Sequence, residues 1–129
     1  MNILLDAMGG DNAPDANIKG ALKAINQIKA DITLIGKEEV IRQKIKEFTG
    51  KEMEEVSPKF KIKNATETIE MEDQPTMAIK HKKDSSMVVG FKMLKEGEGD
   101  VFISAGNSGA LLAGATLLVG RIKGIDRPA

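Results

Sequence analysis

Residues 2–15 read NILLDAMGGDNAPD, a short apolar run that leads directly into a glycine turn. The apolar residues are typical of a buried strand. Gly9 and Gly10 carry no Cβ, so the backbone there can turn sharply and approach a ligand closely. Pro14 is expected at the first position of a helix, where its missing N–H costs no hydrogen bond. This order of strand, glycine turn and helix is typical of a site at the carboxyl edge of an α/β sheet.

The length and composition are those of one compact globular domain. The 129 residues are 41% hydrophobic and 29% charged, with a formal net charge of zero and only 3% aromatic residues. Few stacking side chains and no excess of positive charge argue against nucleic-acid binding. The sequence has no Cys and a single His81. Disulfides, a Cys nucleophile and a multi-histidine metal site are therefore excluded, and no cofactor is expected.

Strand and helix patterns alternate along the chain. The predicted strands are residues 2–6, 31–36, 60–64 and 100–104. The predicted helices are residues 14–30, 38–49, 76–80, 85–97 and 110–121. This order predicts a three-layer α/β/α fold with a mostly parallel sheet and helices on both faces. The last helix is nearly uncharged, so we expect it to be buried on several sides.

The turn at residues 6–11 is the first candidate site, and Asp6 and Asp11 flank it with carboxylates. It lacks the three-glycine spacing of a dinucleotide-binding loop, and no Gly-Lys-Ser/Thr of a Walker A loop follows. The competing interpretation is a tight turn in which Asp11 or Asn12 caps the next helix.

The second candidate site is the segment 105–109, where a predicted strand meets a helix. It contains Gly106, Asn107, Ser108 and Gly109. Exposed N–H groups at a helix start attract anions such as phosphate. The alternative is that Asn107 or Ser108 only caps a buried helix, and both interpretations can hold together.

The third candidate site is a basic run that contains Lys82 and Lys83 and ends in Ser85 and Ser86. Such a run is usually a solvated face. This one precedes a helix N-terminus, where cations do not favour the helix dipole, so we expect it to serve an anion. Ser85 or Ser86 is expected to cap the helix, and His81 is expected to lie at the surface.

Parallel strands would bring these three loops to one rim of the sheet. Together they supply carboxylates, lysines, hydroxyl groups and oriented N–H groups. This combination suits a phosphate or a phosphorylated ligand beside a reacting carbonyl. A Ser-His-Asp triad is disfavoured, because the only histidine lies in the lysine run.

Four motifs resemble the amino-terminal part of the phosphate acyltransferases of phospholipid synthesis, the PlsX family. They are DAMGGD at 6–11 with Pro14, KKDSSM at 82–87, SAGNSGAL at 104–111 and GRIKGIDRPA at 120–129. The motifs span the whole chain in the family's order. The resemblance implies the fold of phosphotransacetylases and of isocitrate and isopropylmalate dehydrogenases.

The resemblance also implies an activity and a setting. PlsX-type enzymes move an acyl group from acyl carrier protein to inorganic phosphate, and a membrane acyltransferase then passes it to glycerol 3-phosphate. They are usually homodimers, and they are cytoplasmic proteins that associate peripherally with the membrane. Family members continue well past residue 129, so we expect this chain to be the first part of a longer enzyme. Residues 1–129 alone are expected to form little acyl phosphate.

Within this resemblance we expect catalytic roles for Lys83, Asn107 and Ser108. The wider set expected to bind phosphate or substrate is Asp6, Gly9, Gly10, Asp11, Lys82, Ser85, Ser86, Gly106 and Gly109. Asp6 and Asp11 are expected to order the loop and not to act as acid or base, because a carboxylate repels phosphate. Position 108 is Ser where the family usually has Thr, and the hydroxyl is kept.

Three other functions stay open. A phosphotransacetylase would act on a short acyl-CoA. A dehydrogenase of the isopropylmalate type would need metal-binding carboxylates and a cofactor loop, and neither can be assembled from this sequence. A non-catalytic module would bind phosphate or carrier protein without turnover. Because carrier proteins are generally acidic, the basic segment 80–95 is the expected docking face.

Overall fold

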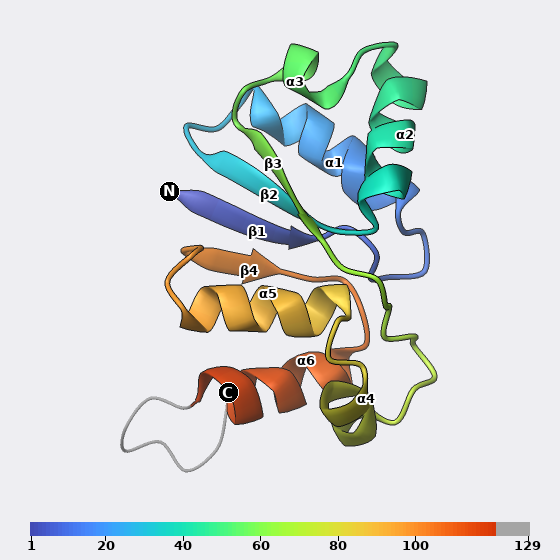
Figure 1. The fold of residues 1–129 in the computed structure, drawn as a ribbon, viewed down its shortest axis with the longest axis vertical. Helices are drawn as coiled ribbons and strands as arrows, with labels where there is room; N and C mark the ends of the chain where they lie inside the picture. Colours follow the sequence, from blue (N-terminus) through green and yellow to red (C-terminus); the bar gives the residue numbers. More distant parts are fainter. Residues whose placement is uncertain (121–129) are drawn as a thin grey trace.

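The computed structural model describes residues 1–120 and contains a four-stranded sheet (Figure 1). The strands are β1 (Asn2–Asp6), β2 (Asp31–Gly36), β3 (Phe60–Asn64) and β4 (Val101–Ile103). Their order is β3-β2-β1-β4, and all three pairings are parallel. The predicted α/β class with a parallel sheet is confirmed.

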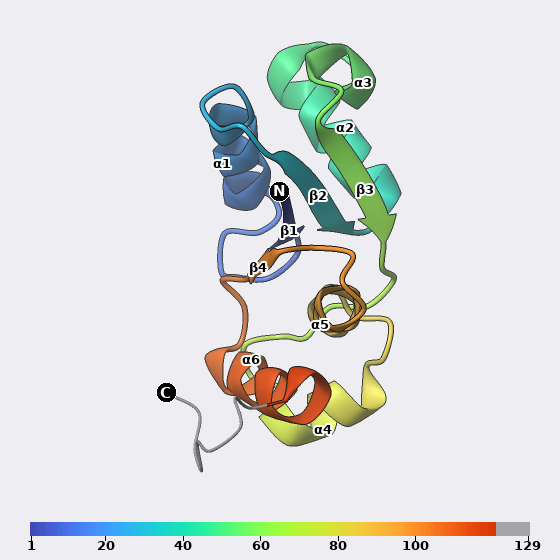
Figure 2. The same ribbon diagram turned by 90° about the vertical axis from the view of Figure 1, so that its left-hand side faces the viewer.

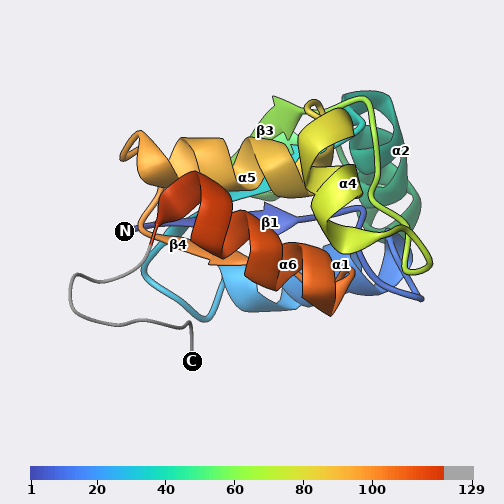
Figure 3. The same cartoon turned by 90° about the horizontal axis from the view of Figure 1, so that it is seen from below.

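Helices connect the strands and form the outer layers. They are α1 (Asp15–Ile25), α2 (Glu38–Thr49), α3 (Met53–Val56), α4 (Pro75–His81), α5 (Ser86–Lys95) and α6 (Ser108–Gly114), followed by a π-helical turn η1 (Ala115–Val119). The α1 and α2 helices share one hydrophobic core with β2 and β3. The α5 helix packs on the opposite face, and Figure 2 shows it end-on there. The α4 and α6 helices pack outside α5 (Figure 3).

The parallel register brings the carboxyl ends of the strands to one edge of the sheet. Asp6 pairs with Ile35 on one side, and its neighbour Leu5 pairs with Ile103 on the other. The β1 strand is therefore flanked on both sides at the point where the chain leaves the sheet. Loops after β1 and β4 start next to each other, which is the arrangement at a topological switch point.

Packing between α5 and β4 depends on a glycine. The Phe102 ring of β4 meets the Phe91 ring of α5 edge-on, with centroids 5.1 Å apart and an interplanar angle of 69°. A Cβ at Gly90 would lie 2.3 Å from Cε1 of Phe102. Gly90 thus lets the helix approach the strand closely enough for the aromatic pair to form.

Several predicted boundaries differ from the structure. The first helix ends at Ile25 and not at Ala30, and the Lys59 ammonium donates to the carbonyls of Ile25 (2.7 Å) and Ile28 (3.0 Å) at this end. Pro14 is the N-cap residue and not the first helical residue. Asp11 and Asn12 precede it, so neither caps the helix as expected. The short helix α3 was not predicted.

The prediction that the last helix, residues 110–121, is buried on several sides is wrong. The structure describes it to residue 120 as α6 followed by η1, and residue 121 lies outside the described residues. Leu112 and Leu117 are 51% and 57% exposed. Since α6 packs against α4 and α5, only the side that faces these helices is covered.

Two identical substitutions at helical glycines are expected to act in opposite directions. Gly90→Ala should lower the free energy of unfolding by roughly 1–3 kcal/mol, because the new methyl group clashes with Phe102. Gly20→Ala should raise it by about 0.4–1 kcal/mol, because no atom lies within 4 Å of its Cβ position in α1. Urea unfolding curves of both variants measure this. Equal effects of the two substitutions would contradict the packing described.

Candidate functional site at the carboxyl edge of the sheet

A buried carboxylate organises the carboxyl edge of the sheet. Asp6 is 1% exposed and lies at the end of β1. Its Oδ1 accepts hydrogen bonds from the backbone N–H groups of Met8 and Gly9, both at 3.0 Å, and from the Ser86 hydroxyl at 2.6 Å. Its Oδ2 accepts from the Ser104 hydroxyl at 2.8 Å. One side chain therefore joins the β1 turn, the start of α5 and the end of β4.

The turns after β1 and β4 touch through their glycines. A Cβ at Gly9 would lie 2.6 Å from Asp6 Oδ2 and 3.1 Å from the Cα of Gly106. Gly10 has a φ of +114°, a conformation that L side chains rarely adopt. The backbone N–H of Gly106 donates to Ser104 Oγ at 3.1 Å, which links the second turn to Asp6. The two loops thus form one continuous wall.

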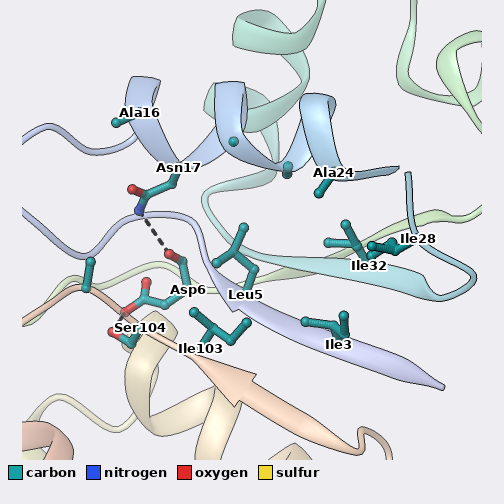
Figure 4. Close-up of a pocket in the computed structure, with 13 residues that line it drawn as sticks. Ile3, Leu5, Asp6, Ala16, Asn17, Ala24, Ile28, Ile32, Ile103 and Ser104 are labelled. Carbon is teal, nitrogen blue, oxygen red and sulfur yellow. Dashed lines mark hydrogen bonds between the residues drawn. The ribbon is translucent and has the colours of Figure 1, made fainter. Parts of the chain in front are cut away.

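The β1 turn is also fixed from the side of α1. The Asn17 amide donates to the carbonyls of Asp6 at 3.0 Å, Ala7 at 3.1 Å and Gly9 at 2.8 Å. Figure 4 shows this side chain reaching from α1 to the end of β1. The carbonyls of the turn point toward α1, and the N–H groups of Met8 and Gly9 point toward Asp6.

The start of α5 is held by buried hydroxyl groups. Ser85 is the N-cap residue and its Oγ accepts from the Val88 N–H at 3.2 Å, so the expected serine cap is confirmed at Ser85. Ser86 donates to Asp6. Glu67 forms an isolated parallel bridge with Ser85. The loop after β3 is thereby joined to the same edge of the sheet.

Asn107 ties this loop to the start of α6. Its Oδ1 accepts from the Ala110 N–H at 3.1 Å, and Asn107 is the N-cap residue of α6. Its amide donates to the carbonyls of Glu70 at 3.1 Å, Met71 at 3.3 Å and Asp73 at 2.9 Å. The side chain is 6% exposed in total and is fully engaged by these contacts.

Two carboxylates of the surrounding loops are held in their charged form. The Lys82 ammonium lies 2.7 Å from Asp73 Oδ2, and this hydrogen bond holds the pKa of Asp73 below its ordinary value. Thr66 donates to Asp84 from its hydroxyl at 2.6 Å and from its N–H at 3.0 Å. These bonds likewise lower the pKa of Asp84. Lys82 offsets negative charge of the loop beside Asn107.

The structure brings together about half of the residues expected from the sequence. Contacts through Asp6 and between the glycine turns join one group: Asp6, Gly9, Gly10, Ser86 and Gly106. Asn107, Ser108 and Gly109 follow directly at the start of α6, where Ser108 and Gly109 are exposed. Lys83 instead lines a groove formed by α4, α5 and η1. Asp11 is exposed in the loop before α1.

Ser104 and Asn17 belong to the site, and the sequence reasoning did not select them. Ser104 bridges Asp6 and Gly106, and Asn17 binds the β1 turn from α1. Ser104 immediately precedes the second glycine turn, so its place in the motif was a usable signal. Asn17 lies on a helix face and carried no local signal.

Two classes of feature are absent from residues 1–120. No group of three or more His, Cys, Asp or Glu side chains in this part of the chain is arranged to hold a metal ion. Among the helices described here, none has both the length and the apolar character needed to cross a bilayer.

Asp6→Asn tests the role of the buried carboxylate. The carboxylate of Asp6 accepts hydrogen bonds at both oxygens, whereas an asparagine amide accepts at one oxygen only. The NH2 group of the amide would therefore face another donor, either the Ser104 hydroxyl or the Ser86 hydroxyl with the Gly9 N–H. The free energy of unfolding should fall by roughly 1–3 kcal/mol in urea titrations. The exposed Asp11→Asn is the matched control and should change stability by less than about 0.5 kcal/mol. An Asp6→Asn variant as stable as this control would refute the role.

Comparisons with known proteins identify the family. The family model described as "Fatty acid synthesis protein" matches residues 1–129. The phosphate acyltransferase of Acetivibrio thermocellus is 56% identical over 130 residues, which cover the whole chain and 37% of that protein. The phosphate acyltransferase of Clostridioides difficile is 51% identical over 128 residues, covering 99% of the chain and 36% of the relative. The chain thus spans little more than a third of the length of these relatives, and it belongs to the fatty acid synthesis protein family.

Proposed function

We propose that this chain supplies the phosphate-binding part of an enzyme that transfers a fatty acyl group to inorganic phosphate. The observation that carries the proposal is the contact between the two glycine turns, with Gly9 and Gly106 back to back at the switch point. Parallel α/β sheets bind ligands at this place. The relatives named phosphate acyltransferase support the reaction type.

The proposed chemistry needs no activated side chain. Hydrogen phosphate is itself an anionic nucleophile, and one of its oxygens attacks the carbonyl carbon of the acyl thioester. A C–O bond forms, the C–S bond breaks, and the proton of hydrogen phosphate ends on the departing thiol. The site therefore has to position phosphate against the carbonyl and stabilise the tetrahedral oxyanion.

The residues at the start of α6 are proposed to contact phosphate. N–H groups in the first turn of a helix have no intrahelical partner. Ser108 and Gly109 are the first two residues of α6, and both are exposed. Ser108 adds a hydroxyl. Asn107 is proposed to act by holding this turn in place, since its amide is already used by Ala110 and by three carbonyls.

The buried polar residues behind the loops are proposed to order them. Both oxygens of Asp6 accept hydrogen bonds, so Asp6 has a structural part and is not the base. Ser85 caps α5. Lys82 is paired with Asp73, whereas Lys80 and Lys83 are exposed and line the groove of α4, α5 and η1.

We propose acyl carrier protein as the acyl donor, docked on the groove between α4, α5 and η1. Three lysines and four apolar side chains line this groove: Ile79, Lys80, Lys83, Val88, Lys92, Leu117 and Leu118. A groove lined by apolar and cationic side chains fits an amphipathic acidic helix, since the charges steer the encounter and the apolar side chains bury surface.

The setting proposed for the whole enzyme follows the PlsX resemblance. It would act in the cytoplasm as a homodimer that associates peripherally with membranes. A membrane acyltransferase would consume the acyl phosphate by transfer to glycerol 3-phosphate. The family description, which names fatty acid synthesis, supports this metabolic context.

A chimera tests the proposed reaction. Residues 1–129 are joined to the part of the A. thermocellus phosphate acyltransferase that the match does not cover. Acyl phosphate should form from long-chain acyl carrier protein and phosphate, trapped with hydroxylamine and measured against the intact relative. Gly106→Val in the chimera should lower the rate roughly 100-fold or more, because a Cβ there would already lie 3.2 Å from Met87 and 3.5 Å from Gly9, and the two valine methyl groups would crowd the contact between the turns further.

The alternatives give different results in the same chimera. Faster turnover with acetyl-CoA than with acyl carrier protein would indicate a phosphotransacetylase. Thermal stabilisation by NAD would indicate a dehydrogenase. A folded chimera without turnover would indicate a binding module, and each of these outcomes contradicts the proposal.

Charge reversal tests the carrier-protein surface on the chain itself. The double substitution Lys83→Glu and Lys92→Glu should weaken binding of acyl carrier protein by roughly tenfold or more, with the loss greatest at low salt. Lys51→Glu, at an exposed lysine between α2 and α3, is the matched control and should leave the affinity unchanged. Titration calorimetry at two salt concentrations measures both. Equal affinities for the double variant and the unmodified chain would rule out this surface.

A further inference from the structure

The loop between β3 and α4 lies against the second glycine turn, residues 105–109. We call residues 68–74 of this loop the acidic loop. The Asn107 amide donates to three of its carbonyls, at 2.9 to 3.3 Å. Where the loop ends and α4 begins, a Cβ on Gly109 would lie 2.7 Å from Cγ of Pro75. The acidic loop therefore determines where the glycine turn lies.

The acidic loop is irregular, and its charges repel one another. It contains the carboxylates of Glu70, Glu72 and Asp73. Like charges this close together disfavour a fixed loop, and they also repel phosphate. Ile69 anchors one part of the loop, since it is 4% exposed and lies in the core cluster that contains Ala110 of α6. The acidic part needs a counter-charge to keep its shape.

The Lys82 ammonium supplies this counter-charge. It lies 2.7 Å from Asp73 Oδ2 and donates to the Thr68 carbonyl at 2.9 Å. The same Oδ2 accepts from the Glu70 N–H at 2.8 Å, so one carboxylate oxygen both closes the loop and binds the lysine. Lys82 follows α4 and precedes the Ser85 cap of α5, which ties the acidic loop to both helices.

We infer that Lys82 and Asp73 are positioning residues, whose ion pair holds the acidic loop against Asn107 and thereby sets the second glycine turn. Neither side chain touches phosphate. The two side chains are 32% and 27% exposed, and a lysine drawn away toward a ligand would leave Asp73 unpaired in an acidic loop. The effect on catalysis rests on the proposed acyl transfer to phosphate, whereas the contacts of the loop do not.

Hydrogen exchange in the chain itself tests the positioning in the absence of phosphate. The Ala110 N–H donates to Asn107 Oδ1, so its exchange rate reports whether Asn107 is held. Lys82→Met removes the ammonium and should speed this exchange roughly tenfold, while the amides of β2 keep their protection. Lys46→Met is the matched control. It breaks another lysine–carboxylate pair, with Glu52 at 3.1 Å, and should change neither rate.

Steady-state kinetics in the A. thermocellus chimera test the consequence for the proposed reaction. Lys82→Met should raise the KM for phosphate roughly tenfold and leave the KM for acyl carrier protein within about twofold. Asp73→Ala separates positioning from direct contact, because it breaks the pair and keeps the ammonium. We expect it to raise the KM for phosphate as Lys82→Met does. A lysine that bound phosphate directly would instead be released, and this KM would stay the same or fall.

Three results would overturn the inference. The first is unchanged exchange at Ala110 in Lys82→Met. The second is loss of β2 protection in the same variant, since the pair would then support the whole fold and not the turn. The third is a KM for phosphate that Asp73→Ala leaves unchanged or lowers. An unmodified chimera without turnover would contradict the proposed reaction, and the exchange experiment would still decide whether the pair holds the turn.

Discussion

The candidate site depends on one buried carboxylate and the four donors that surround it. Asp6 is held by two backbone N–H groups and by the hydroxyls of Ser86 and Ser104. A charge buried without such partners would be strongly destabilising, so the three segments that supply the donors must meet at the end of β1. The buried carboxylate also requires glycine at position 9, because a side chain there would occupy the space of the carboxylate and of Gly106.

The polar residues of the site fall into two groups, those that hold the loops in place and those that can contact a ligand. Asp6, Ser85 and Asn107 are buried and already make internal hydrogen bonds, so their contribution is the shape of the loops. Groups that remain exposed, such as Ser108, are left to meet a ligand. In the proposed reaction phosphate brings its own nucleophilic oxygen, and a rigid cradle then matters more than an activated side chain.

Local sequence signals predicted most of the fold and less of the site. The strands at 31–36 and 60–64 and the helix at 38–49 have the predicted bounds, because apolar periodicity and the left-handed Gly50 act locally. The last carbonyl of α1 is bound by Lys59, which lies 34 residues from Ile25, so this contact carried no local signal. Asp6 and Ser104 are 98 residues apart, so no local pattern could pair them. The short helix α3 begins at a Glu52 cap, an unusual capping residue.

The proposed phosphate site lies at the two glycine turns, and Asp6 sets its shape. Its most direct test is the set of backbone amide chemical shifts in the chimera as inorganic phosphate is added, with chloride as the reference anion. We expect saturable shifts at Gly9, Gly106, Ser108 and Gly109, and their loss in Asp6→Asn. Shifts confined to the lysines of the α4–α5 groove, or no saturable shift at the turns, would contradict it.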